Sequence, residues 1–259
     1  MSLYVITHKY PDQVVELPGY QYLYVGAFRQ KERRPGYAYD DDGENISIKN
    51  ANYCELTGLY WIWKNSTEEN VGLAHYRRFF THNSFSASAK YFYSVEELDK
   101  FLQKYDLILC ERQYVAAKNL YENYAQYHYG KDLDLFRKVI GQVTPDYLAS
   151  FDAVLNRNCY SACNMFYAKK ELIDQYCEWL FPLMQVFESK IDISQYNALQ
   201  ARVYGYLAER LLNVWIEKNL IKTKELPMIQ TDCSYKHRIR LKLDKIFKRA
   251  IREKVYYEK

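Results

Sequence analysis

The chain of 259 residues, 49% of them hydrophobic, is long enough to fold as one large domain with its own core. Its formal net charge of +4 is concentrated in residues 234–259, where ten Lys or Arg against three acidic residues give +7. The other 233 residues therefore carry −3, which argues against a body built to bind nucleic acid.

Strand patterns alternate with helix patterns along the chain. Buried-strand patterns occur at residues 3–7, 21–27, 71–75, 105–110, 163–169 and 225–232. Helical spacing occurs at residues 50–64, 94–104, 121–143, 144–156, 170–189 and 200–219, with an interruption expected near Pro182. The polar stretch 29–47 reads as a long loop. This alternation predicts an α/β fold with a mostly parallel central sheet flanked by helices over residues 1–233, followed by a basic C-terminal helix over 234–259.

Composition and the N-terminus bear on the cellular setting. The 28 tyrosines suit a protein that binds polar ring-shaped ligands such as sugars, although a codon bias towards Tyr, Lys and Asn explains them better. The six cysteines complete no zinc pattern, so we expect reduced thiols. No apolar run approaches the ~20 residues of a membrane span, and MSLYVITHKY lacks the basic and apolar regions of a signal peptide. We therefore expect a soluble, cytoplasmic protein.

The stretch VGLAHYRRFF places His75, Tyr76, Arg77 and Arg78 at the end of a predicted central strand. Ligands of open α/β sheets bind beyond the carboxyl ends of the strands. Two arginines and a histidine could neutralise a diphosphate, since a guanidinium binds phosphate in a bidentate manner. Neighbouring residues of an extended chain point to opposite sides, so we expect only one arginine to reach the ligand. Ordinary surface charges are the alternative.

Thr7, His8 and Lys9 follow the first strand in the same way, and either a nucleotide site or a capping turn before Pro11 explains them. The acidic run Asp40–Asp42 lacks the register of a calcium-binding EF-hand loop. It is expected to be a flexible loop, although its carboxylates could still approach a substrate.

Glu209 and Arg210 interrupt an apolar helix pattern. A carboxylate among apolar neighbours can have a raised pKa and act as a general base. The alternative is a solvated glutamate paired with Arg202 or Arg210.

The segments NISIKNANYCELTGLYWIWKN, VGLAHYRRFF, CNMFYAKKELIDQYCEWLF and RVYGYLAERLLNVWI resemble a bacterial family first catalogued as a domain of unknown function. Genes of that family lie in capsule, exopolysaccharide and O-antigen clusters and include galactofuranosyltransferases. The resemblance, over about residues 3–229, implies a GT-A-like glycosyltransferase that uses a nucleotide sugar. It implies that residues 7–9 and 75–78 bind the donor, that Asn164 and Arg210 contact sugar or acceptor, and that Glu209 is the base.

Most GT-A enzymes end the central strand in an Asp-x-Asp that holds a divalent metal, whereas this chain has His75-Tyr76-Arg77-Arg78. We therefore expect no metal cofactor, with cationic side chains stabilising the departing diphosphate, while Mn²⁺ or Mg²⁺ stays open.

The resemblance implies transfer of galactofuranose or galactose from a UDP-sugar to a lipid-linked acceptor in surface polysaccharide synthesis. The alternative is a non-catalytic module that binds nucleotide sugars or nucleic acid, of which the charge distribution disfavours nucleic acid. Residues Ile239, Leu243, Ile246 and Ala250 share one face of the predicted basic helix, which Phe247, Ile251 and Val255 widen. Such a helix can lie on an anionic membrane, which would make the protein peripheral at the inner face of the cell membrane, or it can pack on the body.

Overall fold

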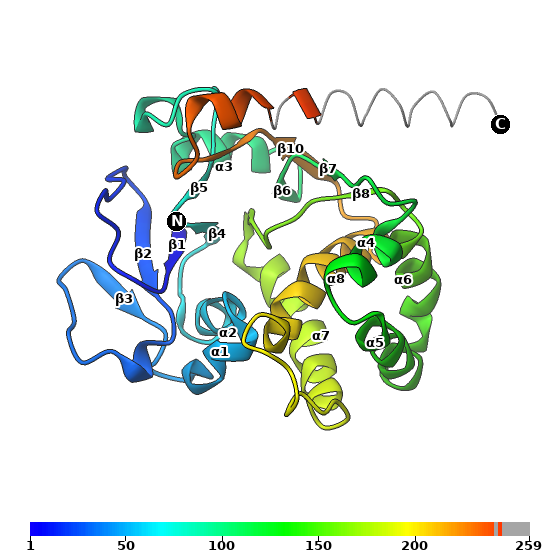
Figure 1. Ribbon diagram of the computed structural model, residues 1–259. Helices are drawn as coiled ribbons and strands as arrows, with labels where there is room; N and C mark the ends of the chain where they lie inside the picture. The colour runs from blue at the N-terminus through cyan, green and yellow to red at the C-terminus, as the bar shows by residue number, and fades with distance from the viewer. Residues whose placement is uncertain (241–242, 245–259) are drawn as a thin grey trace.

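The computed structural model describes residues 1–240, 243 and 244, and a mixed sheet lies at its centre. Nine strands of these residues form the sheet in the order β10–β6–β9–β4–β1–β2–β3, with β5 paired to β4 and β11 paired to β5 (Figure 1). Only β9 and β5 run against the other strands, so the predicted mostly parallel sheet is confirmed. The strands are β1 (Ser2–Thr7), β2 (Tyr20–Tyr24), β3 (Tyr37–Tyr39), β4 (Asn70–His75), β5 (Arg78–Phe80), β6 (Leu107–Cys110), β9 (Phe166–Lys169), β10 (Thr223–Leu226) and β11 (Met228–Gln230), beside a separate pair, β7 (Gln113–Tyr114) and β8 (Cys159–Tyr160).

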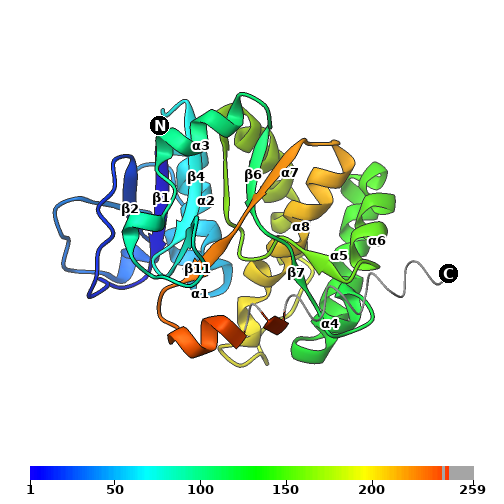
Figure 2. The ribbon, with the colours of Figure 1, turned by 90° about the horizontal axis from the view of Figure 1, so that it is seen from above.

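Helices cover both faces of the sheet. Figure 2 shows α5 and α6 as the outermost layer, beyond α7 and α8 on the side away from β2. The helices are α1 (Asn50–Tyr53), α2 (Leu56–Asn65), α3 (Val95–Leu102), α4 (Leu120–Tyr127), α5 (Gly130–Val143), α6 (Leu148–Leu155), α7 (Lys170–Glu188) and α8 (Val203–Lys218), with 3₁₀ turns η1 (Ala27–Arg29), η2 (Ser47–Lys49), η3 (Ala89–Tyr91), η4 (Pro145–Tyr147) and η5 (Gln200–Arg202).

The alternation of side chains along each strand divides the core into two layers. In β1, Tyr4 and Ile6 face the larger layer with α2, α5, α6, α7 and α8, whereas Leu3 faces a smaller layer that includes α3. Gly72 lies in β4, between β1 and β9, and a Cβ at this position would come within 2.5 Å of Leu3 and 2.6 Å of Tyr167. The close packing of β4 against β1 and β9 therefore needs a residue without a side chain.

Three sequence predictions are wrong in detail. The stretch 29–47 contains β3, which pairs in parallel with β2, and is not an irregular loop throughout. The helix expected at 50–64 is two helices, because Cys54 has a φ of 53° and breaks the chain between α1 and α2. Helix α7 continues through Pro182, since the exposed proline loses its backbone donor on the solvent side while its neighbours Phe181 and Leu183 stay buried.

The C-terminal region is described only in part. Residues 235–240 are helical and follow β11. The positions expected to form an amphipathic face at Ile246, Phe247, Ala250, Ile251 and Val255 lie outside the described residues. No helix among the described residues has the length and apolar character needed to cross a membrane.

Candidate functional site

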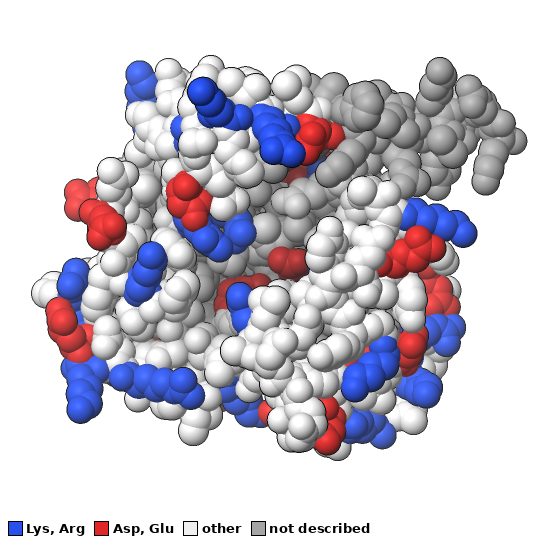
Figure 3. Space-filling model, viewed as in Figure 1, with Lys and Arg blue, Asp and Glu red and all other residues white. Residues whose placement is uncertain are grey.

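A cleft of about 520 Å³ opens where the carboxyl ends of β1, β2 and β4 meet the N-terminal part of α8. Figure 3 shows a hollow near the centre of this face, with acidic and basic side chains at its floor and rim. The sheet side contributes His8 and the β4–β5 connection, and the helical side contributes Glu55 and α8. Among the ten residues expected at a site, six line this cleft, namely His8, His75, Tyr76, Arg77, Arg78 and Glu209.

A tight hairpin places both arginines in the cleft wall. His75, the last residue of β4, pairs directly with Arg78, the first residue of β5, so Tyr76 and Arg77 form a two-residue turn. The prediction that the two arginines point to opposite sides of an extended chain is wrong, because the chain reverses between them. Both Arg77 and Arg78 line the cleft.

The two guanidinium groups differ in their partners. Arg77 donates through Nη1 to Asp232 Oδ2 at 2.9 Å, and the backbone N–H of Thr231 donates to the carbonyl of Arg77 at 2.9 Å. These contacts fix the start of the C-terminal segment beside the cleft. Within the described residues, the guanidinium of Arg78 has neither a hydrogen bond nor an ion pair. Arg78 is therefore the cation in this wall whose donors are open to a ligand.

His75 contributes no positive charge at neutral pH. Its Nε2 lies 2.6 Å from the carbonyl oxygen of Cys163, which can only accept, so Nε2 carries the proton. Burial, together with the nearby charge of Arg78, lowers the pKa of His75 to about 4. Without a ligand the ring is therefore neutral and holds the backbone before β9, and a part for His75 in neutralising a diphosphate stays a prediction.

That backbone is a strained turn. Cys163 and Asn164 both adopt positive φ angles, 71° and 50°, which side-chain-bearing residues rarely do. Three cleft side chains bond to this turn. His75 donates to the carbonyl of Cys163, Glu209 Oε1 accepts from its N–H at 3.1 Å, and Glu55 Oε1 accepts from Asn164 Nδ2 at 2.7 Å. Asn164 is itself buried, so it holds Glu55 at the cleft floor.

Glu209 is the carboxylate with the most perturbed surroundings in the cleft. Its Oε2 accepts from Arg210 Nη1 at 3.2 Å and from the Tyr160 hydroxyl at 3.5 Å. Burial raises the pKa of Glu209, and the charge of Glu55 adds to the effect while that of Arg210 opposes it. Arg210 is 4% exposed and its guanidinium lies 4.9 Å from the ring centre of Tyr160, so Arg210 contacts Glu209 from behind.

The residues after β1 form a turn. The Thr7 hydroxyl is buried and donates to the carbonyl of Lys9, which is the capping geometry that the sequence left open. His8 lines the cleft, and its ring meets that of Tyr76 edge-on at 5.5 Å between centroids. Burial lowers the pKa of His8, with Lys9 and Arg202 contributing, so this ring is also neutral at pH 7. Lys9 is exposed, with its ammonium 5.4 Å from the ring centre of Tyr76.

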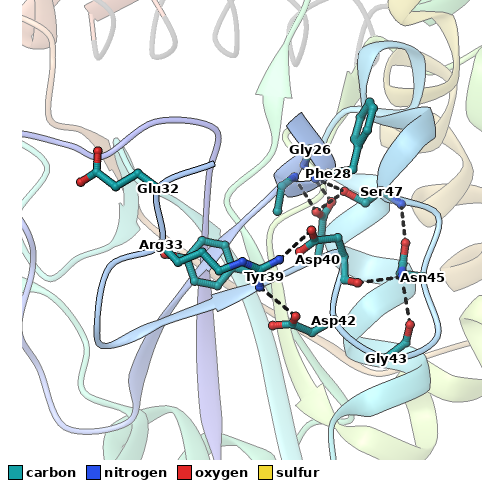
Figure 4. Close-up of polar contacts among 12 residues, drawn as sticks. Gly26, Phe28, Glu32, Arg33, Tyr39, Asp40, Asp42, Gly43, Asn45 and Ser47 are labelled. Atoms are coloured by element: carbon teal, nitrogen blue, oxygen red, sulfur yellow. Dashed lines mark hydrogen bonds and ion pairs between the residues drawn. The ribbon is translucent and has the colours of Figure 1, made fainter. Parts of the chain in front are cut away.

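The acidic run Asp40–Asp42 is outside the cleft lining. Asp40 is fully buried and accepts four hydrogen bonds, from the N–H groups of Gly26 and Ala27 and the hydroxyls of Ser47 and Thr57. Figure 4 shows Asp40 beside Gly26 and Ser47. Asp41 and Asp42 both pair with Arg33. The prediction of a flexible acidic loop is wrong, because Asp40 ties the end of β2 to η2 and α2 and so supports the cleft wall at Val25 and Glu55.

Two charged residues of the cleft, Glu55 and Arg202, have no signal in the sequence that would assign them to a site. Arg202 is the N-cap residue of α8, and its Nε donates to the sulfur of Cys54 at 3.1 Å. Among the described residues, no group of three or more His, Cys, Asp or Glu side chains is arranged to hold a metal ion.

The chain is similar to known proteins in sequence and in fold. A family model described as a domain of unknown function (DUF4422) matches residues 2–220. The chain matches no curated protein. Among solved structures, the apo structure of the WbbM bifunctional glycosyltransferase is similar, with a TM-score of 0.78 and 28% sequence identity. The match covers 90% of this chain and 45% of that chain, so the present chain spans less than half the length of that protein. The likeness identifies a glycosyltransferase-like domain.

Proposed function

The chain belongs to the DUF4422 family, and we propose that it is a GT-A-like glycosyltransferase that uses a UDP-sugar. The observation that carries the proposal is one cleft with an arginine wall and a half-buried carboxylate, that of Glu209, whose pKa is raised. An arginine wall suits the diphosphate of a sugar nucleotide, and a carboxylate with a raised pKa suits removal of a hydroxyl proton.

In the proposed reaction, Arg78 and Arg77 hold the diphosphate of the donor at the carboxyl end of β4. An acceptor hydroxyl attacks the anomeric carbon, a new C–O bond forms, and the bond between that carbon and the diphosphate oxygen breaks. Glu209 takes the proton of the hydroxyl. The negative charge that develops on the leaving UDP is stabilised by guanidinium groups that are already in place, so little reorganisation is needed.

The other polar residues around the cleft are assigned positioning roles and not direct contact with the reacting groups. His75, Asn164 and Arg210 are proposed to position Glu55 and Glu209, because each bonds to one of these carboxylates or to the turn that carries them. The donor sugar is proposed to be galactofuranose or galactose, and the acceptor a lipid-linked saccharide of a surface polysaccharide.

The test is UDP release measured with UDP-galactose, UDP-galactofuranose and UDP-glucose, each with and without a lipid-linked saccharide extract. We expect acceptor-dependent release with a galactose donor that Glu209→Gln abolishes. Glu217→Gln is the matched control, since Glu217 lies on the same helix but pairs with Arg157 away from the cleft. A protein that binds UDP but releases none from any donor would be a nucleotide-sugar binding module instead.

A further inference from the structure

A second wall of the cleft, apart from the β4–β5 hairpin with Arg77 and Arg78, runs along the start of α8. Arg202, Tyr206 and Glu209 are spaced by four and three residues and all three line the cleft, so they share one side of the start of this helix. Tyr206 therefore lies one turn beyond Glu209 on the same surface. A saccharide that reaches Glu209 along this wall of the cleft contacts Tyr206.

The ring of Tyr206 is supported from α4. It stacks on His128, with 4.0 Å between centroids and an interplanar angle of 24°. His128 directly follows α4, and its Nδ1 lies 3.1 Å from Gln200 Oε1, which can only accept. Gln200 in turn donates through Nε2 to the carbonyl of Tyr127 at 2.8 Å. These bonds fix the end of α4 against η5, so the surface next to Tyr206 is formed before any ligand arrives.

This surface combines exposed rings with polar groups. Tyr127 precedes His128 in the chain and its ring side chain is 66% exposed, and the aliphatic Leu199 precedes Gln200 and is 54% exposed. Both therefore remain open to solvent beside the hydrogen-bonded pair of His128 and Gln200. Aromatic rings pack on the apolar C–H faces of sugars, and the amide, imidazole and phenol groups beside them bond to sugar hydroxyls. His128 adds no positive charge to this surface, because burial lowers its pKa, and the cation next to the Tyr206 ring is Arg202, whose guanidinium lies 5.6 Å from the ring centre.

We propose that Tyr206, His128, Tyr127 and Gln200 form the subsite for the saccharide acceptor. The inference rests on the proposed function. If transfer is a single displacement, with the donor diphosphate on Arg77 and Arg78, the acceptor hydroxyl approaches the reacting carbon from the side opposite the diphosphate. A sugar ring on Tyr206 places that hydroxyl next to Glu209, and further sugar units extend over His128 and Tyr127.

The test is saturation-transfer NMR on the full chain with UDP bound, using the methyl glycosides of β-galactopyranose, β-galactofuranose, β-glucose and N-acetyl-β-glucosamine as probes. We expect transfer to at least one glycoside, reduced about fivefold in Tyr206→Ala and in Tyr127→Ala because one ring contact is lost in each. Tyr206→Phe keeps the ring and should keep more than half of the signal. Phe85→Ala, which removes another partly exposed ring, is the matched control and should match the wild type.

UDP affinity, measured by calorimetry on the same proteins, separates the two proposals. Two outcomes with normal UDP binding would refute the subsite while the proposed function stands. In one, the Ala variants give the wild-type glycoside signal; in the other, no glycoside receives saturation from the wild-type protein. If the wild-type protein binds no UDP, the proposed function fails and the acceptor subsite fails with it.

Discussion

The ion pair between Arg77 and Asp232 should oppose donor binding, so the variant Asp232→Asn should bind the donor more tightly. The carboxylate of Asp232 occupies donors of the guanidinium that we assign to the diphosphate, at 2.9 Å from Nη1. A diphosphate must displace this carboxylate before it can use the same donors. The variant leaves the backbone bond from Thr231 to the carbonyl of Arg77 in place, so the turn itself should persist.

The size of the gain follows from exposure. The Arg77 and Asp232 side chains are 38% and 43% exposed, and ion pairs of this kind contribute ~0.2–1 kcal/mol. If the whole contribution is lost when the donor binds, its removal raises affinity for UDP by about 1.4- to 5-fold. Repulsion between the carboxylate and the diphosphate acts in the same direction.

Calorimetric titration with UDP measures this effect. Asp152→Asn is the matched control, because Asp152 pairs with Arg137 at 2.7 Å with similar exposure, away from the cleft. In the background of Arg77→Ala, Asp232→Asn should change affinity much less than in the wild type. Unchanged or weaker UDP binding in Asp232→Asn would refute the competition, and an equal gain in both backgrounds would show that the ion pair is not its cause.

Further predictions concern the base, the second arginine, metal and the C-terminus. A general base must be deprotonated, and burial raises the pKa of Glu209 above the ordinary 4.5, so kcat should fall as pH drops through that raised pKa. Glu209→Gln should lower kcat by about 10²–10⁴ with unchanged UDP affinity, and a normal rate would show that Glu209 has only a structural role. Arg78→Ala should weaken UDP binding more than Arg77→Ala, since Arg78 has no ion pair to give up among the described residues; the reverse order by calorimetry would contradict this. Activity should survive EDTA, and loss with rescue by Mn²⁺ would show a metal-dependent enzyme. The full chain should sediment with anionic but not neutral liposomes and be released by high salt, and truncation after Cys233 should remove this binding; an insoluble truncated protein would place the helix in the core instead.

The sequence predicted those parts of the fold that depend on periodicity. The buried runs that became β1, β4 and β6 were identified because their apolar residues are continuous and short. The break between α1 and α2 was missed, since nothing about a cysteine indicates the φ of 53° at Cys54. That break has a consequence for the site, because Glu55 follows it directly and lines the cleft. In a continuous helix, the direction of the Glu55 side chain would instead be set by the helical rotation from Tyr53.

The hairpin at His75–Arg78 shows a second limit. HYRR was recognised as a ligand-binding stretch from its place after a strand, but its two central residues are neither Gly nor Asn, the usual signals of a two-residue turn. What stabilises the reversal lies elsewhere in the chain, since Arg78 pairs with Gln230 of β11 and Thr231 bonds to Arg77. Pairing with a strand some 150 residues away leaves no local pattern to read.

The Cys163–Asn164 turn explains why the roles of individual polar residues were the hardest part to predict. Its bonds to His75, Glu209 and Glu55 connect residues separated by 88, 46 and 109 positions. Two consecutive left-handed residues cost free energy, so the turn persists because these three side chains bond to it. Those side chains are therefore positioned by the turn as much as the turn is by them. His75 and Asn164 drew notice as chemical groups, a cation and a sugar ligand, and those roles stay predictions, whereas their contacts in the structure are with this turn and with Glu55.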